Sequence, residues 1–233
     1  MIEDIKQGRL PRGKKAVIAL TSWKKRINTV GLTIFNLFTM CGSDFHIVLT
    51  LAEEEFPNKE QELPRDLVLM NKAGMFEILW VKKNYRAFKK WLFCAKRYQR
   101  VPIISADDDC VYTCNYAEEL YNAWRMHPKA VISYHLYNLG GQLFQNGPAT
   151  LYPPNTIDVN KCALNKFVAL NADDVFIGII LHELNIDIIE LRHDRPYVFH
   201  DCTGALSDHE MPVQTYYDIM QPMIKYYCDM IKQ

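Results

Sequence analysis

The chain has 233 residues, of which 49% are hydrophobic and 23% charged, and its 27 basic and 27 acidic side chains give a formal net charge of zero. This composition is typical of a globular protein, and a neutral chain gives no reason to expect nucleic acid as a partner. No apolar run approaches the roughly 18 to 20 residues that a membrane-spanning helix needs. Seven cysteines without paired spacing do not indicate a zinc site.

We therefore expect one domain over residues 1–233, with a polar lead-in at 1–15 that has no features of a signal peptide. Apolar runs predict strands at 16–20, 45–51, 76–81, 101–106, 130–135, 186–191 and 197–199. Helical spacing of apolar residues predicts helices at 27–41, 85–98, 115–126, from about 173 to 181, and at 215–233. This alternation predicts an α/β, Rossmann-like fold with a mostly parallel central sheet flanked by helices.

Residues 138–161 differ from the rest of the chain because glycine, proline and asparagine cluster there in turn-forming pairs. The spacing predicts a long loop without regular structure. Loops of this length in a compact domain usually bind something or move.

Three consecutive aspartates, Asp107, Asp108 and Asp109, follow the apolar run at 101–106. Adjacent carboxylates repel one another, so a cation would explain the cluster, and oxygen ligands suit Mg²⁺ or Mn²⁺. Alternate residues of an extended chain share a face, so Asp107 and Asp109 can hold one ion while Asp108 points elsewhere. The alternative is an acidic connection between a strand and a helix.

A polar and basic segment at 21–26 follows the first predicted strand. Ligands of open parallel sheets bind beyond the carboxyl ends of the strands, so this segment and the aspartates should meet at one edge. Basic residues at 82–100 could serve the same small anion, such as a nucleotide diphosphate. The alternative for most of these lysines is a solvated helix face.

The pattern resembles the nucleotide-sugar glycosyltransferases of the GT-A fold, in which an Asp-any-Asp motif holds Mn²⁺ or Mg²⁺ against the donor diphosphate. Asp107 to Asp109, with the Cys-Val-Tyr that follows, is similar to this motif in Fringe-like β-1,3-glycosyltransferases and in bacterial family-2-like enzymes. A second stretch, Asp173-Asp174-Val-Phe-Ile-Gly178, resembles the later acidic motif of the same family. The resemblance runs from about residue 16 to about residue 200.

The resemblance implies a role for each acidic motif. Asp109 would be the principal metal ligand, with Asp107 on the metal or the donor ribose. Asp174 would be the catalytic base of an inverting enzyme, taking the proton of the acceptor hydroxyl, and Asp173 is the fallback for that role. Family members often add a late histidine to the metal, for which His200 is the first choice and His193 the competitor.

The resemblance also implies a set of donor contacts. The expected nucleotide-binding residues are Thr21, Arg26, Glu53, Lys90, Asp107 and Asp108. Lys89 and Trp91 lie where relatives hold the donor, and Asn146, Gly147 and Tyr152 where a sugar is usually met. For Trp91 the alternative is core packing, and for Tyr152 it is a place in a loop without contact to substrate.

The expected function is therefore metal-dependent transfer of a sugar from a nucleotide diphosphate, a UDP-sugar first, to a glycan or lipid-linked acceptor. Family members of the Golgi type carry an anchor and disulfides, and their lack here favours a cytoplasmic enzyme of polysaccharide biosynthesis, with peripheral contact at the inner membrane left open. Three alternatives stay open: a retaining GT-A enzyme, a sugar-phosphate nucleotidyltransferase, and a non-catalytic sugar-binding module. The nucleotidyltransferase would want a glycine-rich loop after the first strand, and residues 21–26 contain no glycine. A phosphatase with an aspartyl nucleophile would carry its acidic motif after the first strand instead.

Overall fold

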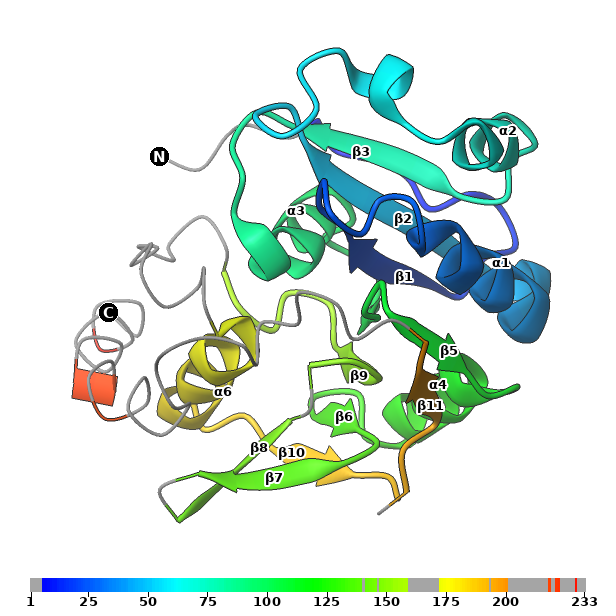
Figure 1. Ribbon diagram of the computed structural model, residues 1–233. Helices are drawn as coiled ribbons and strands as arrows, with labels where there is room; N and C mark the ends of the chain where they lie inside the picture. Colours follow the sequence, from blue (N-terminus) through cyan, green and yellow to red (C-terminus); the bar gives the residue numbers. More distant parts are fainter. Residues whose placement is uncertain are drawn as a thin grey trace.

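We describe a computed structural model of the chain over residues 6–139, 141–145, 147–158, 172–192 and 194–200, with positions 218, 221, 222 and 229. The first half alternates strand and helix as predicted (Figure 1). Its elements are β1 (Ala16–Thr21), α1 (Val30–Cys41), β2 (Phe45–Ala52), α2 (Arg65–Lys72), β3 (Glu77–Val81) and α3 (Lys89–Arg97). Short 3₁₀ turns lie at Gly42–Asp44, Lys59–Glu62 and Arg86–Phe88.

The second half has shorter strands and two further helices within the described residues. Its elements are β4 (Ile103–Ser105), β5 (Cys110–Tyr112), α4 (Tyr116–Met126), β6 (Val131–Ser133), β7 (Leu136–Leu139), β8 (Gln142–Gln145), β9 (Thr150–Tyr152), α6 (Asp173–Glu183), β10 (Ile188–Glu190) and β11 (Tyr197–Phe199). The predicted helix at 215–233 lies outside the described residues, apart from positions 218, 221, 222 and 229, which are helical.

Seven strands form the central sheet in the order β10-β6-β9-β4-β1-β2-β3. Strand β1 is parallel to both neighbours, with Ala19 opposite Val48 of β2 and Ser105 of β4. Strand β9 alone runs the other way in this sheet, antiparallel to β4 and to β6. The sheet is therefore mostly parallel, and the predicted α/β class is confirmed.

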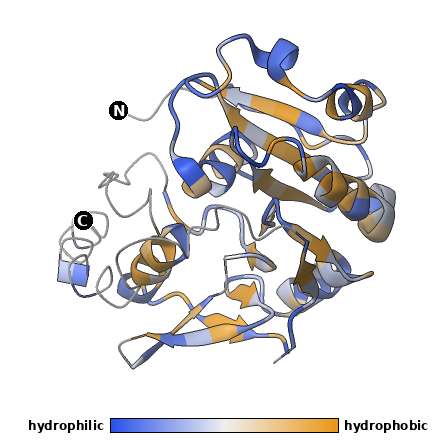
Figure 2. Cartoon of the chain, viewed as in Figure 1, coloured by the Kyte–Doolittle hydropathy of each residue, from blue (hydrophilic) through white to orange (hydrophobic). Residues whose placement is uncertain are grey.

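Two apolar cores cover the two faces of the sheet, because successive side chains of β1 point to opposite sides. Val17 and Ala19 pack with residues of α3 and α6, whereas Ile18 and Leu20 pack with residues of α1 and α4. All four side chains are fully buried. Figure 2 shows hydrophobic residues along most of the length of β1 and β2. No helix within the described ranges is long and apolar enough to cross a membrane.

The prediction of a long loop at 138–161 is wrong in part, because the end of one short strand and two complete short strands lie within it. Strands β7 and β8 pair as a hairpin, and β9 is a central strand of the main sheet. Strand β9 is only three residues long and lies between turn-forming residues, so its sequence carries no periodic signal. Its three residues are nevertheless buried, because a strand on each side and both cores enclose them.

Candidate functional site

The two polar segments predicted to meet do meet, beyond the carboxyl ends of β1 and β4. The Ser22 hydroxyl donates a hydrogen bond to Asp108 Oδ2 at 2.6 Å. Arg26 places Nη2 3.1 Å from Asp108 Oδ1 and pairs through Nη1 with Asp109 Oδ2. Ser22 was not singled out from the sequence, although it lies inside the basic segment that was. The arginine thus lies between two of the three aspartates.

Lys90 joins the two acidic motifs. Helix α3 begins at Lys89, at the carboxyl edge of the sheet, so its first turn reaches the aspartates that follow β4. The Lys90 ammonium pairs with Asp107 Oδ1 and lies 3.8 Å from Asp173 Oδ2. The Lys90 side chain is only 5% exposed, so water contributes little to balancing its charge. Two aspartates separated by 66 positions in the sequence therefore share one buried cation.

Asp174 lies in the first turn of α6 with both carboxylate oxygens engaged. The Val175 amide donates to Oδ1 at 2.9 Å, and the Tyr137 hydroxyl donates to Oδ2 at 3.1 Å. The Gln145 side-chain amide donates to the Asp174 backbone carbonyl at 2.8 Å. Tyr137 and Gln145 come from the β7–β8 hairpin and were not predicted, since Tyr137 lies between the predicted strand at 130–135 and the predicted loop, and Gln145 lies inside that loop. The hairpin fixes the direction of the Asp174 carboxylate.

Burial controls the acidities of these carboxylates. Burial raises the pKa of Asp108 to about 6, against the opposing effects of Arg26 and Ser22. Burial also raises the pKa of Asp173 to about 6, although Lys90 opposes the shift. The pKa of Asp174 is raised by burial, while the bonds from Val175 and Tyr137 lower it. Burial opposes the charge of Lys90, but Asp107 and Asp173 outweigh it and raise the pKa of the ammonium.

The lysines of α3 are buried, so the alternative of a solvated helix face is wrong for Lys89, Lys90 and Lys96. Lys89 Nζ lies 3.6 Å from Glu55 Oε2 and 3.2 Å from Asn84 Oδ1. Burial lowers the pKa of Lys89 to about 8. The spacing of apolar residues does not show that Glu55, which follows β2, and Asp107, which follows β4, approach Lys89 and Lys90, and the prediction was wrong for this reason.

Two of the predicted nucleotide contacts are engaged with other groups of the chain. The Thr21 hydroxyl donates a hydrogen bond to the Thr50 carbonyl at 2.6 Å. Glu53, directly after β2, forms an ion pair with Lys59 at 2.9 Å. Both lie at the carboxyl edge of the sheet, the edge that the sequence predicted for them.

His200 lies next to the aspartate motif through its backbone. Its amide donates to the Asp109 carbonyl at 2.8 Å, just beyond the pairing of β11 with β5. Its Nε2 lies 2.9 Å from the Thr33 hydroxyl oxygen, and that hydroxyl also reaches the Asp108 carbonyl at 3.0 Å and the Cys110 carbonyl at 2.8 Å. Thr33 was not noticed in the sequence. His193 and Asn146, two further predicted residues, lie outside the described residues.

Across the described ranges, no three histidine, cysteine, aspartate or glutamate side chains are grouped so that they could hold a metal ion. The predicted set of Asp107, Asp109 and His200 is therefore not assembled, because Lys90, Arg26 and Thr33 respectively hold these side chains. Burial, and after it the charge of Asp107, raise the pKa of Asp109, so the two carboxylates lie within electrostatic reach of each other. Two carboxylates together with substrate phosphates form a common Mg²⁺ site, so the donor chemistry of this pair fits a hard divalent ion.

Trp91 and Tyr152 belong to the core. Core packing is the alternative stated for Trp91, whereas Tyr152 lies in β9 and not in a loop. Their rings meet edge to face with centroids 5.8 Å apart, and Trp91 also stacks on Phe88. The two side chains are 3% and 2% exposed. Gly147 lies close to the acidic motif, since a Cβ atom there would come within 3.9 Å of the Asp174 Cβ.

No protein-family model matches the sequence, and no curated protein sequence matches it. Among solved structures, the chain is similar to TarS of S. aureus, residues 1–349, in complex with UDP-GlcNAc, with 11% identity and a TM-score of 0.54 over 92% of this chain and 66% of that chain. A second TarS structure, in complex with UDP, has 10% identity and a TM-score of 0.55 over 78% and 59%. The chain thus spans about three fifths to two thirds of these structures. The likeness shows that the chain shares its fold with these structures of TarS.

Proposed function

We propose that the protein is a glycosyltransferase that moves a sugar from a nucleotide diphosphate to a hydroxyl acceptor. The observation that carries the proposal is the buried Lys90, which joins Asp107 of one acidic motif to Asp173 of the other at the carboxyl edge of the sheet. A glycosyltransferase fold with both motifs gathered at its ligand-binding edge supports this chemistry. The resemblance to Fringe-like enzymes remains a prediction from the motifs.

The donor in this proposal is a UDP-sugar, supported by the likeness to structures of TarS in complex with UDP-GlcNAc and UDP. Arg26 and Lys90 are the cations nearest the aspartates, and both can re-pair with phosphate oxygens when a diphosphate enters. Arginine suits this role because its planar donors match phosphate geometry. Thr21, Glu53 and Asp108 remain the proposed contacts of the nucleoside.

Asp107 and Asp109 would hold a divalent ion, Mn²⁺ or Mg²⁺, together with the donor. Such an ion, when bound, supplies positive charge that stabilises the departing diphosphate. His200 is held beside Asp109 and would have to leave Thr33 to present Nε2 to the ion. We keep Asp107 and Asp109 as the proposed ligands and His200 as a third ligand that depends on this change.

Asp174 is the proposed base of an inverting transfer. In that step the acceptor hydroxyl oxygen forms a bond to the anomeric carbon, the bond from that carbon to UDP breaks, and the hydroxyl proton passes to the Asp174 carboxylate. Tyr137 and Val175 hold this carboxylate in a fixed direction, which general-base catalysis requires. Asp173 is the fallback, but its pairing with Lys90 favours a supporting role.

The acceptor in this proposal is a glycan or a lipid-linked glycan, and the setting is cytoplasmic polysaccharide biosynthesis, with peripheral contact at a membrane. Three observations would favour the other candidates. A product with the donor's anomeric configuration would indicate a retaining enzyme. Formation of a nucleotide sugar from a sugar phosphate would indicate a nucleotidyltransferase, and donor binding without transfer or hydrolysis would indicate a binding module.

Calorimetry with UDP tests the proposal directly. We expect UDP to bind in the presence of Mn²⁺ and to lose most of its affinity when a chelator is added. Asp109→Asn should weaken this binding, whereas Asp66→Asn, which changes an exposed aspartate on α2, should not. Binding of UDP that ignores both the metal and the Asp109 substitution would contradict the proposed metal site. A screen of nucleotide sugars for metal-dependent hydrolysis then identifies the donor.

A further inference from the structure

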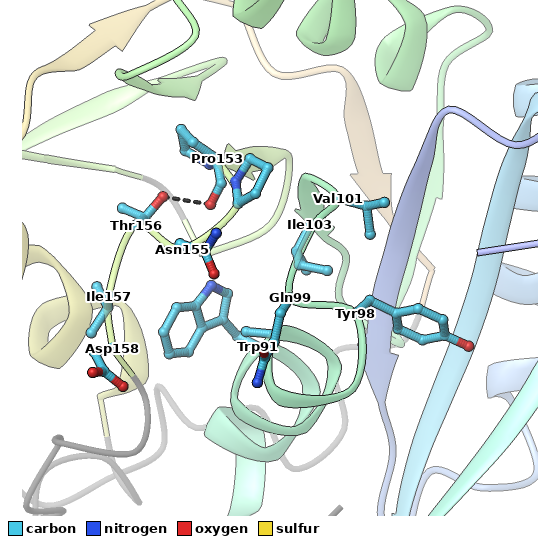
Figure 3. A pocket seen from close by; sticks show the side chains of 12 residues that line it. Trp91, Tyr98, Gln99, Val101, Ile103, Pro153, Asn155, Thr156, Ile157 and Asp158 are labelled. Atoms are coloured by element: carbon cyan, nitrogen blue, oxygen red, sulfur yellow. Dashed lines mark hydrogen bonds between the residues drawn. The ribbon is translucent and has the colours of Figure 1, made fainter. Parts of the chain in front are cut away.

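A pocket of about 320 Å³ lies along α3, apart from the aspartates. One wall is formed by Trp91 and Ala95 of α3 together with Tyr98 and Gln99, which follow the helix. The opposite wall is the segment 153–158 that follows β9 (Figure 3). The pocket borders the start of β4 at Ile103, whereas Asp107 and its neighbours follow the end of that strand. Its volume lies within the range of small-molecule sites.

The pocket is lined by a buried donor that has no partner among the described residues. Trp91 is 3% exposed, and its indole Nε1 forms no hydrogen bond with that part of the chain. Figure 3 shows the indole among the lining side chains with its nitrogen turned toward Asn155. By contrast, Trp80 Nε1 donates to Glu60 at 2.9 Å and Trp124 Nε1 donates to the Pro128 carbonyl at 3.1 Å. A buried N–H without an acceptor is costly, so a ligand oxygen at this point would be stabilised.

The lining combines buried apolar side chains with exposed polar ones. Trp91, Ile103 and Ile157 are buried, whereas Asn155 and Asp158 at the opening are exposed. The Gln99 and Asn155 side chains form no hydrogen bond with the described part of the chain. A ring with one apolar face and a border of hydroxyl groups matches this arrangement, since the amides can each donate and accept. A fatty acyl chain would leave the indole N–H and both amides without partners.

We infer that this pocket binds a saccharide ring, with a ring substituent oxygen accepting the Trp91 N–H and ring hydroxyls contacting Asn155 and Gln99. The pocket is a second sugar site and takes no part in the transfer step. It stands whether or not the proposed function holds, because none of its lining residues belongs to the two acidic motifs. Tyr152 does not line the pocket, and its ring contacts Trp91 edge to face.

Nuclear magnetic resonance of the full chain tests this inference, because its four tryptophans give four indole N–H signals. The signal lost in Trp91→Phe identifies Trp91. Titration with methyl β-D-glucopyranoside and with N-acetylglucosamine should move that signal downfield in a saturable way, as expected when an N–H gains an acceptor. UDP alone should leave the signal in place, which separates this pocket from the proposed donor site.

Asn155→Gly removes the side-chain amide without backbone strain, because Asn155 has φ of 56°, a conformation that glycine adopts freely. It should weaken sugar binding about five- to tenfold, the value of roughly one hydrogen bond. Asn185→Gly is the matched control, since Asn185 is an exposed asparagine with φ of 53° outside the pocket. The inference fails if neither sugar moves the Trp91 signal, if both glycine variants bind alike, or if cyclohexanol moves the signal when the sugars do not.

Discussion

Replacement of Lys90 by methionine tests the link between the two acidic motifs. The substitution keeps most of the side-chain volume but leaves Asp107 and Asp173 without their shared cation. Removal of one partner from a buried ion pair costs about 3–5 kcal/mol. The Asp107 side chain is 30% exposed and partly compensated by water, so we expect the lower end, about 3 kcal/mol.

For a protein of this size, that loss lowers the melting temperature by about 6–12 °C. Differential scanning calorimetry measures it at pH 7.5, which lies above the pKa of about 6 that burial gives Asp173 beside Lys90, so that the ion pair is intact in the unsubstituted protein. Lys83→Met is the matched control, because Lys83 is exposed and such substitutions change stability by less than about 0.5 kcal/mol. Adding Asp107→Asn to Lys90→Met should restore about 1–2 kcal/mol, since one uncompensated charge is removed.

A Lys90→Met protein that melts with the Lys83→Met control would refute the reasoning. So would a double variant less stable than Lys90→Met alone. Either result would mean that the carboxylates find other partners or solvent, and that Lys90 does not hold the two motifs together.

Three further predictions concern α6 and the hairpin that packs on it. Asp174→Asn should reduce sugar transfer by about a hundredfold or more while calorimetric UDP binding stays unchanged, and retained turnover would place the base elsewhere. Tyr137→Phe removes a hydrogen bond that lowers the pKa of Asp174. Because only the deprotonated carboxylate can act as the base, the acid limb of the kcat/KM profile should move to higher pH, and an unmoved limb would exclude Tyr137 from the site. Gly178→Ala would place a Cβ atom 2.2 Å from the Phe144 ring. Alanine normally stabilises a helix by about 1 kcal/mol over glycine, so a fall in melting temperature reports the overpacking cost of about 1–3 kcal/mol, and a rise would contradict this packing.

The sequence predicted the elements whose apolar pattern is long enough to show a period. Strands β1 and β2 and helix α4 were found nearly to the residue, because each consists of an uninterrupted run or a repeated helical spacing. The three-residue strands β5 and β9 and the β7–β8 hairpin were missed, since acidic or turn-forming residues adjoin them, whereas the equally short β11 was predicted at its bounds. Their structure is determined by the strands beside them.

The site likewise has features that could be predicted from the sequence and features that could not. The meeting of Arg26 with Asp108 and Asp109 followed from parallel-sheet geometry alone, because the carboxyl ends of adjacent strands share an edge. The role of Lys90 as a shared buried cation did not follow, since it depends on Asp173 approaching from a helix 83 positions later in the chain. Tyr137 could not be found either, because it lies just before the turn-rich segment at 138–161 and nothing in the sequence marks it as facing Asp174.

The reversed direction of β9 determines which turn reaches the carboxyl edge of the sheet. In a sheet whose strands were all parallel, the turn that precedes each strand would lie at the amino edge, opposite the proposed site. Because β9 is inverted, its entry turn arrives at the working side instead, where the Ala149 amide donates to the Ser105 carbonyl at 3.0 Å and the Ser105 hydroxyl donates to the Gly147 carbonyl at 2.5 Å. Inverting one three-residue strand thus brings Gly147 close to Asp174. If the protein is the proposed glycosyltransferase, substitutions in this turn are expected to alter substrate preference without disturbing the rest of the sheet.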